Sequence, residues 1–398
     1  PLAFLLGLIL ALGLIVTSTM AFAADTSCGV VYVVDGAAYG PTHMASSAGW
    51  HKRVQKFDTN GKFLGKWSTW DCTGLSSGDC RGGRPTHPGD RLGDMGIAID
   101  SKGYVYVQNE RRNSIRKFDS TGRLIASWGI RGCSGTSQIG HACNTPDITI
   151  NHKDILLATD SGRYQIDRWD VTSLDPSGTP VEGTPPRARH SGNDSYSTFA
   201  KPSDVGTAAY GIAADGKGNT YLVSRSLPGI KKFNFKGELV LQWGTRSFEV
   251  GSATPDGKFY QPTGVAVGPD GNVYVTDHGP VHPVQVFSPE GKFIRGFGVD
   301  KTGKARLDSA NFIAVDHCGN VYVTQLDNCA GHPRHKWKGK YCGPESPLAN
   351  WVVKFSPEGK LLTSWGGKGS GDGQLINPMG IAIGKGSGRP KASDCRPK

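Results

Sequence analysis

Short runs in which every second residue is apolar alternate along most of the chain with turns that contain glycine. One unit, from Met95 to Gly129, reads MGIAID, SKG, YVYVQN, SIRKFD, STG and RLIASWG. A period of two is that of a β-strand with one buried face, and turns rich in glycine join antiparallel neighbours. The unit therefore predicts an antiparallel meander of four strands.

The same phrase recurs along the chain. A second clear copy reads TGVAVG, PDG, NVYVTD, PVQVFS, PEG and KFIRGFG, whereas a divergent copy with PDITIN, DILLATD and YQIDRWD lacks the closing W-G. The opening strands of the copies are anchored at Gly96, Asp147, Gly211, Gly264, Phe312 and Gly380. The last copy lacks its V-Y-V strand, and the N-terminal CGVVYVVD lacks an opening strand. We therefore expect one sheet to combine the C-terminal strand with three N-terminal strands, which closes a ring without a free edge.

The phrase P-x-G-[IV]-A-[IV]-x-x-x-G-x-V-Y-V-x-D, followed by K-F and W-G, resembles the NHL repeat of six-bladed β-propellers. The resemblance covers nearly all of residues 28–384 and implies an all-β, six-bladed propeller with one split blade. It implies no single activity, because one fold supports many functions. On this fold, Phe118 and Trp128 are expected in the core between blades.

Composition agrees with this fold class. The chain has 56 Gly, 24 Pro and only 37% apolar residues, which excludes a mainly helical protein. Nine Trp, 12 Tyr and 15 Phe argue against disorder.

The N-terminal segment, residues 1–24, carries no charge and ends in Ala21, Phe22 and Ala23 before Ala24. This pattern predicts a signal peptide, although about 20 apolar residues also suffice for a retained membrane anchor. Either alternative places the propeller, residues 25–398, outside the cytoplasm, in a periplasmic, extracellular or membrane-anchored location.

Nine cysteines in an exported chain predict a disulfide framework with one thiol left over. Short spacing suggests local pairs, and in a closed ring one further bond would replace the turn missing from the split blade. The expected pairs are Cys72 with Cys80, Cys133 with Cys143, Cys329 with Cys342, and Cys28 with Cys395. Cys318 is expected to be the unpaired thiol.

The insertions are expected on one face. Second-to-third-strand connections and connections between blades leave an up-and-down blade on the same side, and loops on a rigid scaffold often carry function. The connections concerned are residues 36–52, 69–92, 130–144, 245–260 and 326–350. The candidate binding residues on this face are His332, Arg334, His335, Lys336, Trp337, Lys338 and Lys340, together with Trp50 and Trp70. Bases beside aromatics suit an acidic protein surface or an anionic polysaccharide, whereas a solvated hairpin is the structural alternative.

Histidine pairs are the candidate metal ligands, namely His332 with His335 and His278 with His282. A metal site needs three or four ligands, and the sequence shows no third ligand beside either pair. An axial metal centre of the kind found in lactonase-type propellers could draw only on Asp147 and Asn311. No cofactor is predicted, although backbone carbonyls could hold a structural calcium ion without leaving a sequence trace.

These observations favour a binding or scaffold subunit of a protein complex or extracellular assembly, with no catalytic residue assigned. The net charge of +11 favours a protein partner with an acidic surface through electrostatic steering, and nucleic acid is not the expected partner. A membrane would be a further partner if residues 1–24 are retained. The alternative is a metal-dependent hydrolase or lyase with a divalent ion near the axis.

Overall fold

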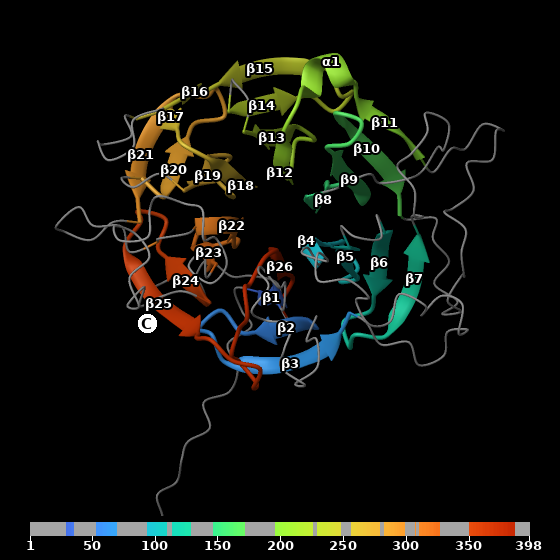
Figure 1. The fold of residues 1–398 in the computed structure, drawn as a ribbon, viewed down its shortest axis with the longest axis vertical. Helices are drawn as coiled ribbons and strands as arrows, with labels where there is room; N and C mark the ends of the chain where they lie inside the picture. Colours follow the sequence, from blue (N-terminus) through green and yellow to red (C-terminus); the bar gives the residue numbers. More distant parts are fainter. Residues whose placement is uncertain are drawn as a thin grey trace, which may run out of the picture.

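Six four-stranded antiparallel sheets are arranged radially around a central axis in the computed structural model (Figure 1). The structure describes residues 29–35, 53–69, 94–109, 114–128, 146–171, 196–225, 229–247, 256–278, 282–298, 307, 310–326 and 350–386. The predicted six-bladed β-propeller is confirmed.

Each blade is a meander that runs from its innermost to its outermost strand. Blade 1 consists of β26 (Ile381–Gly384), β1 (Val30–Asp35), β2 (Arg53–Phe57) and β3 (Phe63–Ser68). Blade 2 consists of β4 (Asp94–Ile99), β5 (Val105–Asn109), β6 (Ser114–Phe118) and β7 (Leu124–Trp128). Blade 3 consists of β8 (Ile148–Ile150), β9 (Ile155–Asp160), β10 (Gln165–Asp170) and β11 (Tyr196–Ala200).

The second half of the ring has the same order. Blade 4 consists of β12 (Ala209–Ala214), β13 (Thr220–Ser224), β14 (Ile230–Phe233) and β15 (Leu239–Trp243). Blade 5 consists of β18 (Pro262–Val267), β19 (Val273–Asp277), β20 (Val284–Phe287) and β21 (Phe293–Phe297). Blade 6 consists of β22 (Ala310–Val315), β23 (Val321–Gln325), β24 (Trp351–Phe355) and β25 (Leu361–Gly366). The helix α1 (Pro202–Val205) and a parallel pair, β16 (Thr245–Arg246) with β17 (Lys258–Phe259), lie between blades.

The ring closes through blade 1, as the missing strands predict. The C-terminal β26 pairs antiparallel with β1, and Val31 lies opposite Ile383 (Figure 1). Two further backbone bonds extend the pairing, from Val34 N–H to the Gly380 carbonyl and from Met379 N–H to the Val34 carbonyl. Both ends of the ring therefore share a continuous hydrogen-bonded sheet and leave no open edge at this seam.

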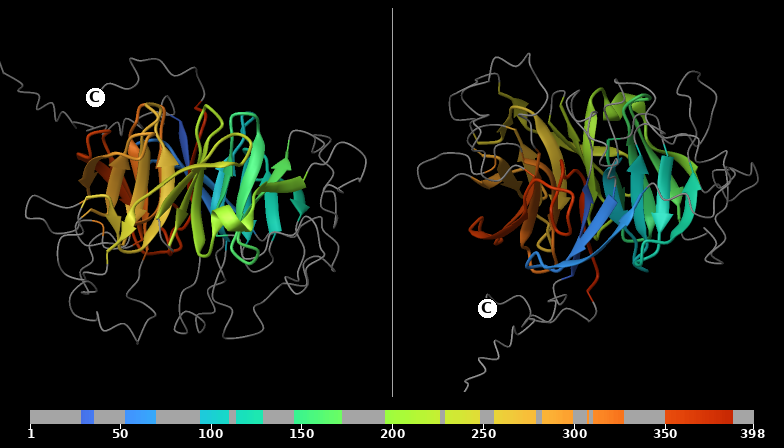
Figure 2. Two further views of the ribbon diagram at one scale, coloured as in Figure 1. Left: turned by 90° about the horizontal axis from the view of Figure 1, so that it is seen from above. Right: turned by 60° about the horizontal axis from the view of Figure 1, so that its bottom comes forward.

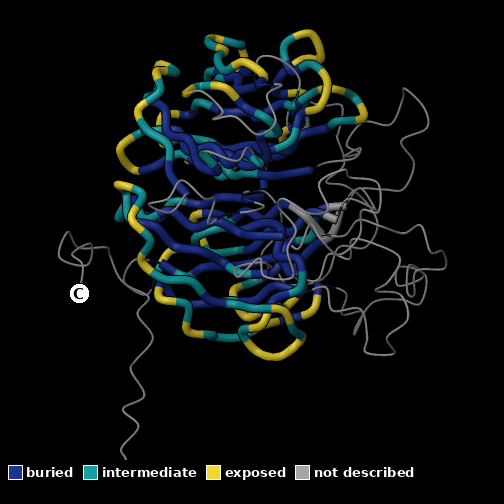
Figure 3. The backbone as a smooth tube through the Cα atoms, turned by 60° about the vertical axis from the view of Figure 1, so that its left-hand side comes forward, coloured by how far each residue is buried: buried dark blue, intermediate teal, exposed yellow. Residues whose placement is uncertain are grey.

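The strands run between two faces of the ring, which is seen edge-on in Figure 2. The turn face carries the connections from first to second and from third to fourth strands; most are short turns, such as residues 100–104 and 58–62, and residues 171–195 between β10 and β11 are a longer one. We call the opposite face the insertion face; there the second strands end, at Asp277 and Gln325 for example, and the chain passes between blades. Exposed residues gather on the turns, whereas the strands are largely buried (Figure 3).

Aspartate fixes the turns between the first and second strands of blades 2, 4 and 6. Asp316 Oδ1 accepts hydrogen bonds from the backbone N–H groups of Cys318 and Asn320, and Oδ2 accepts one from the Tyr322 hydroxyl at 2.8 Å. Gly319 supplies the positive φ, 82°, that this turn requires. The Asp that closes the opening strand thus orients the Tyr of the V-Y-V strand.

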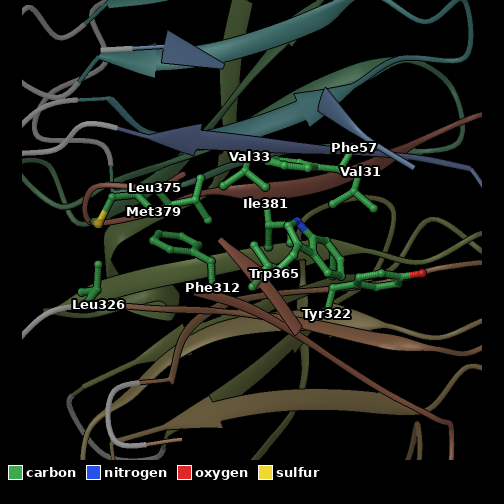
Figure 4. Packing of buried hydrophobic residues seen from close by; sticks show 12 residues of the cluster. Val31, Val33, Phe57, Phe312, Tyr322, Leu326, Trp365, Leu375, Met379 and Ile381 are labelled. Carbon is green, nitrogen blue, oxygen red and sulfur yellow. The ribbon is translucent and has the colours of Figure 1, made fainter. Parts of the chain in front are cut away.

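Aromatic side chains fill the space between blades. Trp365 of blade 6 packs against Phe57 of blade 1 with ring centroids 5.8 Å apart, within the cluster shown in Figure 4. Trp67 of blade 1 repeats this contact with Phe118 of blade 2 at 6.1 Å. Phe118 is therefore core, as predicted, whereas the side chain of Trp128 lies outside the described part of the structure.

Lysines of the K-F phrase tie neighbouring blades together. Lys354 Nζ lies 5.3 Å from the Tyr322 ring centroid and donates to the Thr59 carbonyl of the next blade at 2.8 Å. Equivalent bonds run from Lys56 to the Ser120 carbonyl and from Lys232 to the Pro289 carbonyl, each 3.0 Å long. Part of the positive charge of the chain therefore serves the fold and not a partner.

One cysteine prediction is wrong. Cys318, expected to be the free thiol, is disulfide-bonded. The other eight cysteines were all assigned to predicted pairs, so one of those four pairs cannot form within the chain. All eight lie outside the described residues, and their pairing stays a prediction.

The described residues contain no helix with the length and apolar character needed to cross a bilayer. The predicted signal peptide or anchor, residues 1–24, lies outside them.

Candidate binding site at the insertion face

The innermost strands approach one another closely near the insertion face. A Cβ on Gly211 would lie 2.4 Å from the Thr263 carbonyl oxygen, and one on Gly264 would lie 2.7 Å from the Asn311 carbonyl oxygen. Glycine is needed at these two positions because the neighbouring backbone occupies the space of a side chain. Asp147 and Phe312 stand at the equivalent positions of blades 3 and 6.

Asp147 is a structural carboxyl group. It is buried, its Oδ1 accepts from the Ile148 N–H at 2.9 Å, and its Oδ2 accepts from the Ile212 N–H of blade 4 at 3.1 Å. Burial raises the pKa of Asp147 to about 8, although the two backbone hydrogen bonds lower it. The side chain therefore links two innermost strands and is mostly protonated at neutral pH.

The other axial candidate, Asn311, has separate partners. Its side-chain Nδ2 lies 3.5 Å from the Met379 sulfur, and its backbone carbonyl accepts a hydrogen bond from the Thr263 hydroxyl at 2.9 Å. Within the described ranges, no group of three or more His, Cys, Asp or Glu side chains could hold a metal ion. The described structure thus does not assemble Asp147 and Asn311 into a metal centre.

The Asp that ends the V-Y-V-x-D phrase fastens the chain where it enters a blade. Asp277 accepts from the backbone N–H groups of Tyr260 and Gln261 at 2.8 and 2.6 Å, just before β18. Asp35 accepts from the Ile376 N–H at the equivalent place before β26, and from Arg53 Nε at 2.7 Å. Burial raises the pKa of Asp35, while the Arg53 charge and hydrogen bonds oppose this shift. These carboxylates hold backbone and are not arranged around the axis as ligands.

Two aromatic rings meet near the axis at the insertion-face end of the innermost strands. Tyr210 of β12 and Phe312 of β22 are stacked, with centroids 6.2 Å apart and an interplanar angle of 29°. The guanidinium carbon of Arg225, also at the insertion face, lies 4.0 Å from the Tyr210 ring centroid. We call this group, with His278 and Leu326, the axial mouth.

Three residues of the axial mouth come from equivalent places in the repeat. Arg225, His278 and Leu326 directly follow the second strands of blades 4, 5 and 6. Burial and the positive charge of Arg225 lower the pKa of His278 to about 4, against the effect of a hydrogen bond to the Ala310 backbone. His278 is therefore neutral at physiological pH.

The histidine pair proposed as metal ligands divides between two environments. His278 lies at the axial mouth, whereas His282 Nε2 lies 3.4 Å from Asp256 Oδ1 and its ring lies beside Phe293 of the outermost strand β21. The second pair, His332 with His335, and the remaining candidate binding residues lie outside the described residues; these are Arg334, Lys336, Trp337, Lys338, Lys340, Trp50 and Trp70. Their binding role stays a prediction.

Sequence reasoning missed Arg225 and Tyr210. Aligning the ends of the second strands would have placed Arg225 beside His278, because both residues directly follow a buried strand in equivalent copies. Their joint position would then have marked the axial end of the insertion face.

One family model and several solved structures are similar to this chain. A sequence model of the NHL repeat matches residues 259–287. Among solved structures, the nidogen/laminin complex has a chain with a TM-score of 0.49 and 12% identity, covering 89% of this chain and 98% of that one. A catalytically inactive virginiamycin B lyase from Staphylococcus aureus with quinupristin has a TM-score of 0.44 and 14% identity, covering 73% and 74%. A protein of unknown function from Bacteroides caccae has a TM-score of 0.45 and 13% identity, covering 89% and 98%. Similarity at this level does not extend to function.

Proposed function

We propose that this six-bladed NHL propeller is an exported or membrane-tethered binding subunit that presents its insertion face to a protein partner in a membrane complex or extracellular assembly. The observation that carries the proposal is the contrast between the two faces. Strand-to-strand connections on the turn face are short, as from Phe57 to Phe63, except for residues 171–195 between β10 and β11, whereas Gln325 and Trp351 on the insertion face are joined by a long connection. Long connections on a rigid ring are suited to recognition.

The polar groups inside the ring support a non-catalytic role. Asp147 and Asp277 accept backbone hydrogen bonds with both carboxyl oxygens, and Lys354 donates to the next blade. A hydrolase or lyase with an axial ion would need Asp147 as a ligand, and this would compete with two buried backbone N–H groups for its oxygens. Leaving such groups unbonded costs about 1–3 kcal/mol each.

The disulfide at Cys318 supports the proposed location. Disulfides persist in oxidising compartments and are rare in the reducing cytosol. Export through residues 1–24 would bring the chain into such a compartment.

Cross-linking of the full-length protein in its native membranes or secretions tests the proposal. A lysine-reactive cross-linker should join it to a partner protein through exposed lysines of the insertion face, such as Lys201 and Lys258. Lys102 and Lys217, which are exposed on the turn face, are the internal controls and should give no such products. Recovery solely as a free monomer, or partner links confined to the turn face, would contradict the proposal.

A further inference from the structure

Arg225 is a half-buried cation that has no anionic partner among the residues that the structure describes. Among the described residues it forms no ion pair, its Nε is buried without a hydrogen-bond partner, and its guanidinium lies against the Tyr210 ring at 4.0 Å. The lysines that tie the blades, such as Lys354, instead bond to carbonyl groups. Charged groups at such depth are normally paired, so the guanidinium of Arg225 is chemically incomplete.

The Arg225 side chain is nevertheless held in place. Its backbone N–H donates to the Ala208 carbonyl at 3.0 Å, and Tyr210 is in turn stacked on Phe312. A cation–π contact of this kind contributes on the order of 0.5–2 kcal/mol. The guanidinium is therefore pre-positioned for a planar anion, and less side-chain entropy is lost on binding than for a free Arg.

His278 lies close enough to Arg225 for the two to interact electrostatically. A hydrogen bond to the Ala310 backbone fixes its ring, and its Nε2 is buried without a partner. Because His278 is neutral, Nε2 offers an unused acceptor beside the unused donors of Arg225.

The opposite side of the axial mouth is apolar. Phe312, Leu326 and Met379 belong to one cluster and lie near one another in Figure 4. The mouth thus combines a cation, a neutral acceptor and an apolar wall, and the nearby Asp277 already bonds to the backbone of Tyr260 and Gln261.

We propose that Arg225 and His278 form a receptor for an acidic side chain of the protein partner, with the partner carboxylate on the Arg225 guanidinium and a partner backbone N–H on His278 Nε2. A single Asp or Glu residue of a peptide carries both groups. Arginine pairs with carboxylates through two parallel hydrogen bonds, which uses the donors that the fold leaves free. This inference rests on the proposed function and identifies the chemistry of the partner.

Calorimetric titration of the full-length protein with a short peptide of alternating Gly and Glu tests the inference, with the Gly and Gln analogue as the peptide control. The Glu peptide should bind and the Gln peptide should not. Arg225→Gln should weaken binding by about tenfold to one-hundredfold, the range expected for a lost charged hydrogen-bond pair. Arg225→Lys should retain part of the affinity, since it keeps the charge but loses the planar fork.

Lys217→Gln is the matched control, because it removes one exposed positive charge from the turn face. It should leave the affinity within about twofold of the wild type, since its charge lies far from the mouth and is screened. His278→Phe removes the Nε2 acceptor without changing the net charge and should weaken binding of the Glu peptide several-fold. This variant keeps the inference testable if Arg225→Gln does not fold.

Three results would overturn the inference. The first is that the wild type does not bind the Glu peptide. The second is that the wild type and the Arg225 variants bind the Glu peptide with equal affinity. The third is that a galacturonate oligosaccharide, and not the Glu peptide, binds in a manner that depends on Arg225. The first two leave the cross-linking result of the proposed function untouched. A protein that cross-links to no partner at all would instead refute the proposed function itself.

Discussion

Replacing Asp147 with Asn should give a variant whose stability rises progressively relative to that of the wild type as the pH increases from 5 to 7. Burial raises the pKa of Asp147 in the folded protein to about 8, from an ordinary value of 3.8. The folded chain therefore keeps a proton that the unfolded chain releases above about pH 4. Wild-type stability contributed by this group is fully present at low pH and is lost as the pH rises through this window.

The size of the effect follows from linkage. One proton bound by the folded state alone changes the free energy of unfolding by about 1.4 kcal/mol per pH unit. Asn does not titrate, so the difference between variant and wild type should grow by roughly 3 kcal/mol between pH 5 and pH 7. At pH 5 the variant should be less stable by about 1 kcal/mol, because an amide replaces one of the two acceptors of the Ile148 and Ile212 N–H groups.

Urea unfolding followed by tryptophan fluorescence, with disulfides intact, measures this difference at pH 5, 6 and 7. Asp270→Asn, which removes an exposed carboxyl group from the turn face, is the control for loss of a charge. A difference that stays constant with pH, or that shifts against the variant as the pH rises, would refute the reasoning. It would mean that the two backbone hydrogen bonds outweigh burial and keep Asp147 ionised.

Two further predictions concern the connections between parts of the ring. Lys354→Met should lower the free energy of unfolding by about 2–3 kcal/mol, because it removes a charged hydrogen bond to Thr59 and a cation–π contact with Tyr322. Urea unfolding measures this loss. The exposed control Lys62→Met should lower the free energy of unfolding by less than about 0.5 kcal/mol. Peptide mapping without reduction should join Cys318 to Cys28 or Cys395, because its turn lies on the same face as the paired ends of β1 and β26, and a bond to any other cysteine would contradict this placement.

The fold could be predicted because the repeat encodes it locally. The alternation, the Asp and Gly turns, and the complementary missing strands at the two ends determine six meanders and their closure. The lysine of the K-F phrase could not be interpreted from the sequence. Its role, as at Lys354, depends on a carbonyl 295 residues away in the next blade.

The candidate site was less accessible to sequence reasoning. Asp147 stood out in the sequence as one of only two residues that an axial metal centre could use, but its two backbone partners depend on the close approach of the neighbouring strand. Arg225 drew no attention because the sequence does not show that its guanidinium lies against the Tyr210 ring. The error at Cys318 has a different cause. The other eight cysteines were assigned to one another by short spacing or by closure of the split blade, which left Cys318 over, and the sequence does not show which of them its turn approaches.

Hydrogen exchange on the isolated complex, compared with the free protein, tests most directly whether the insertion face is the binding face. The account predicts slower exchange in the complex at residues 256–261 and 367–377, where the chain enters blades 5 and 1 on this face. Exchange at the turn-face residues 215–219 and 356–360 should not change. Protection confined to the turn face, or none on either face, would contradict the account.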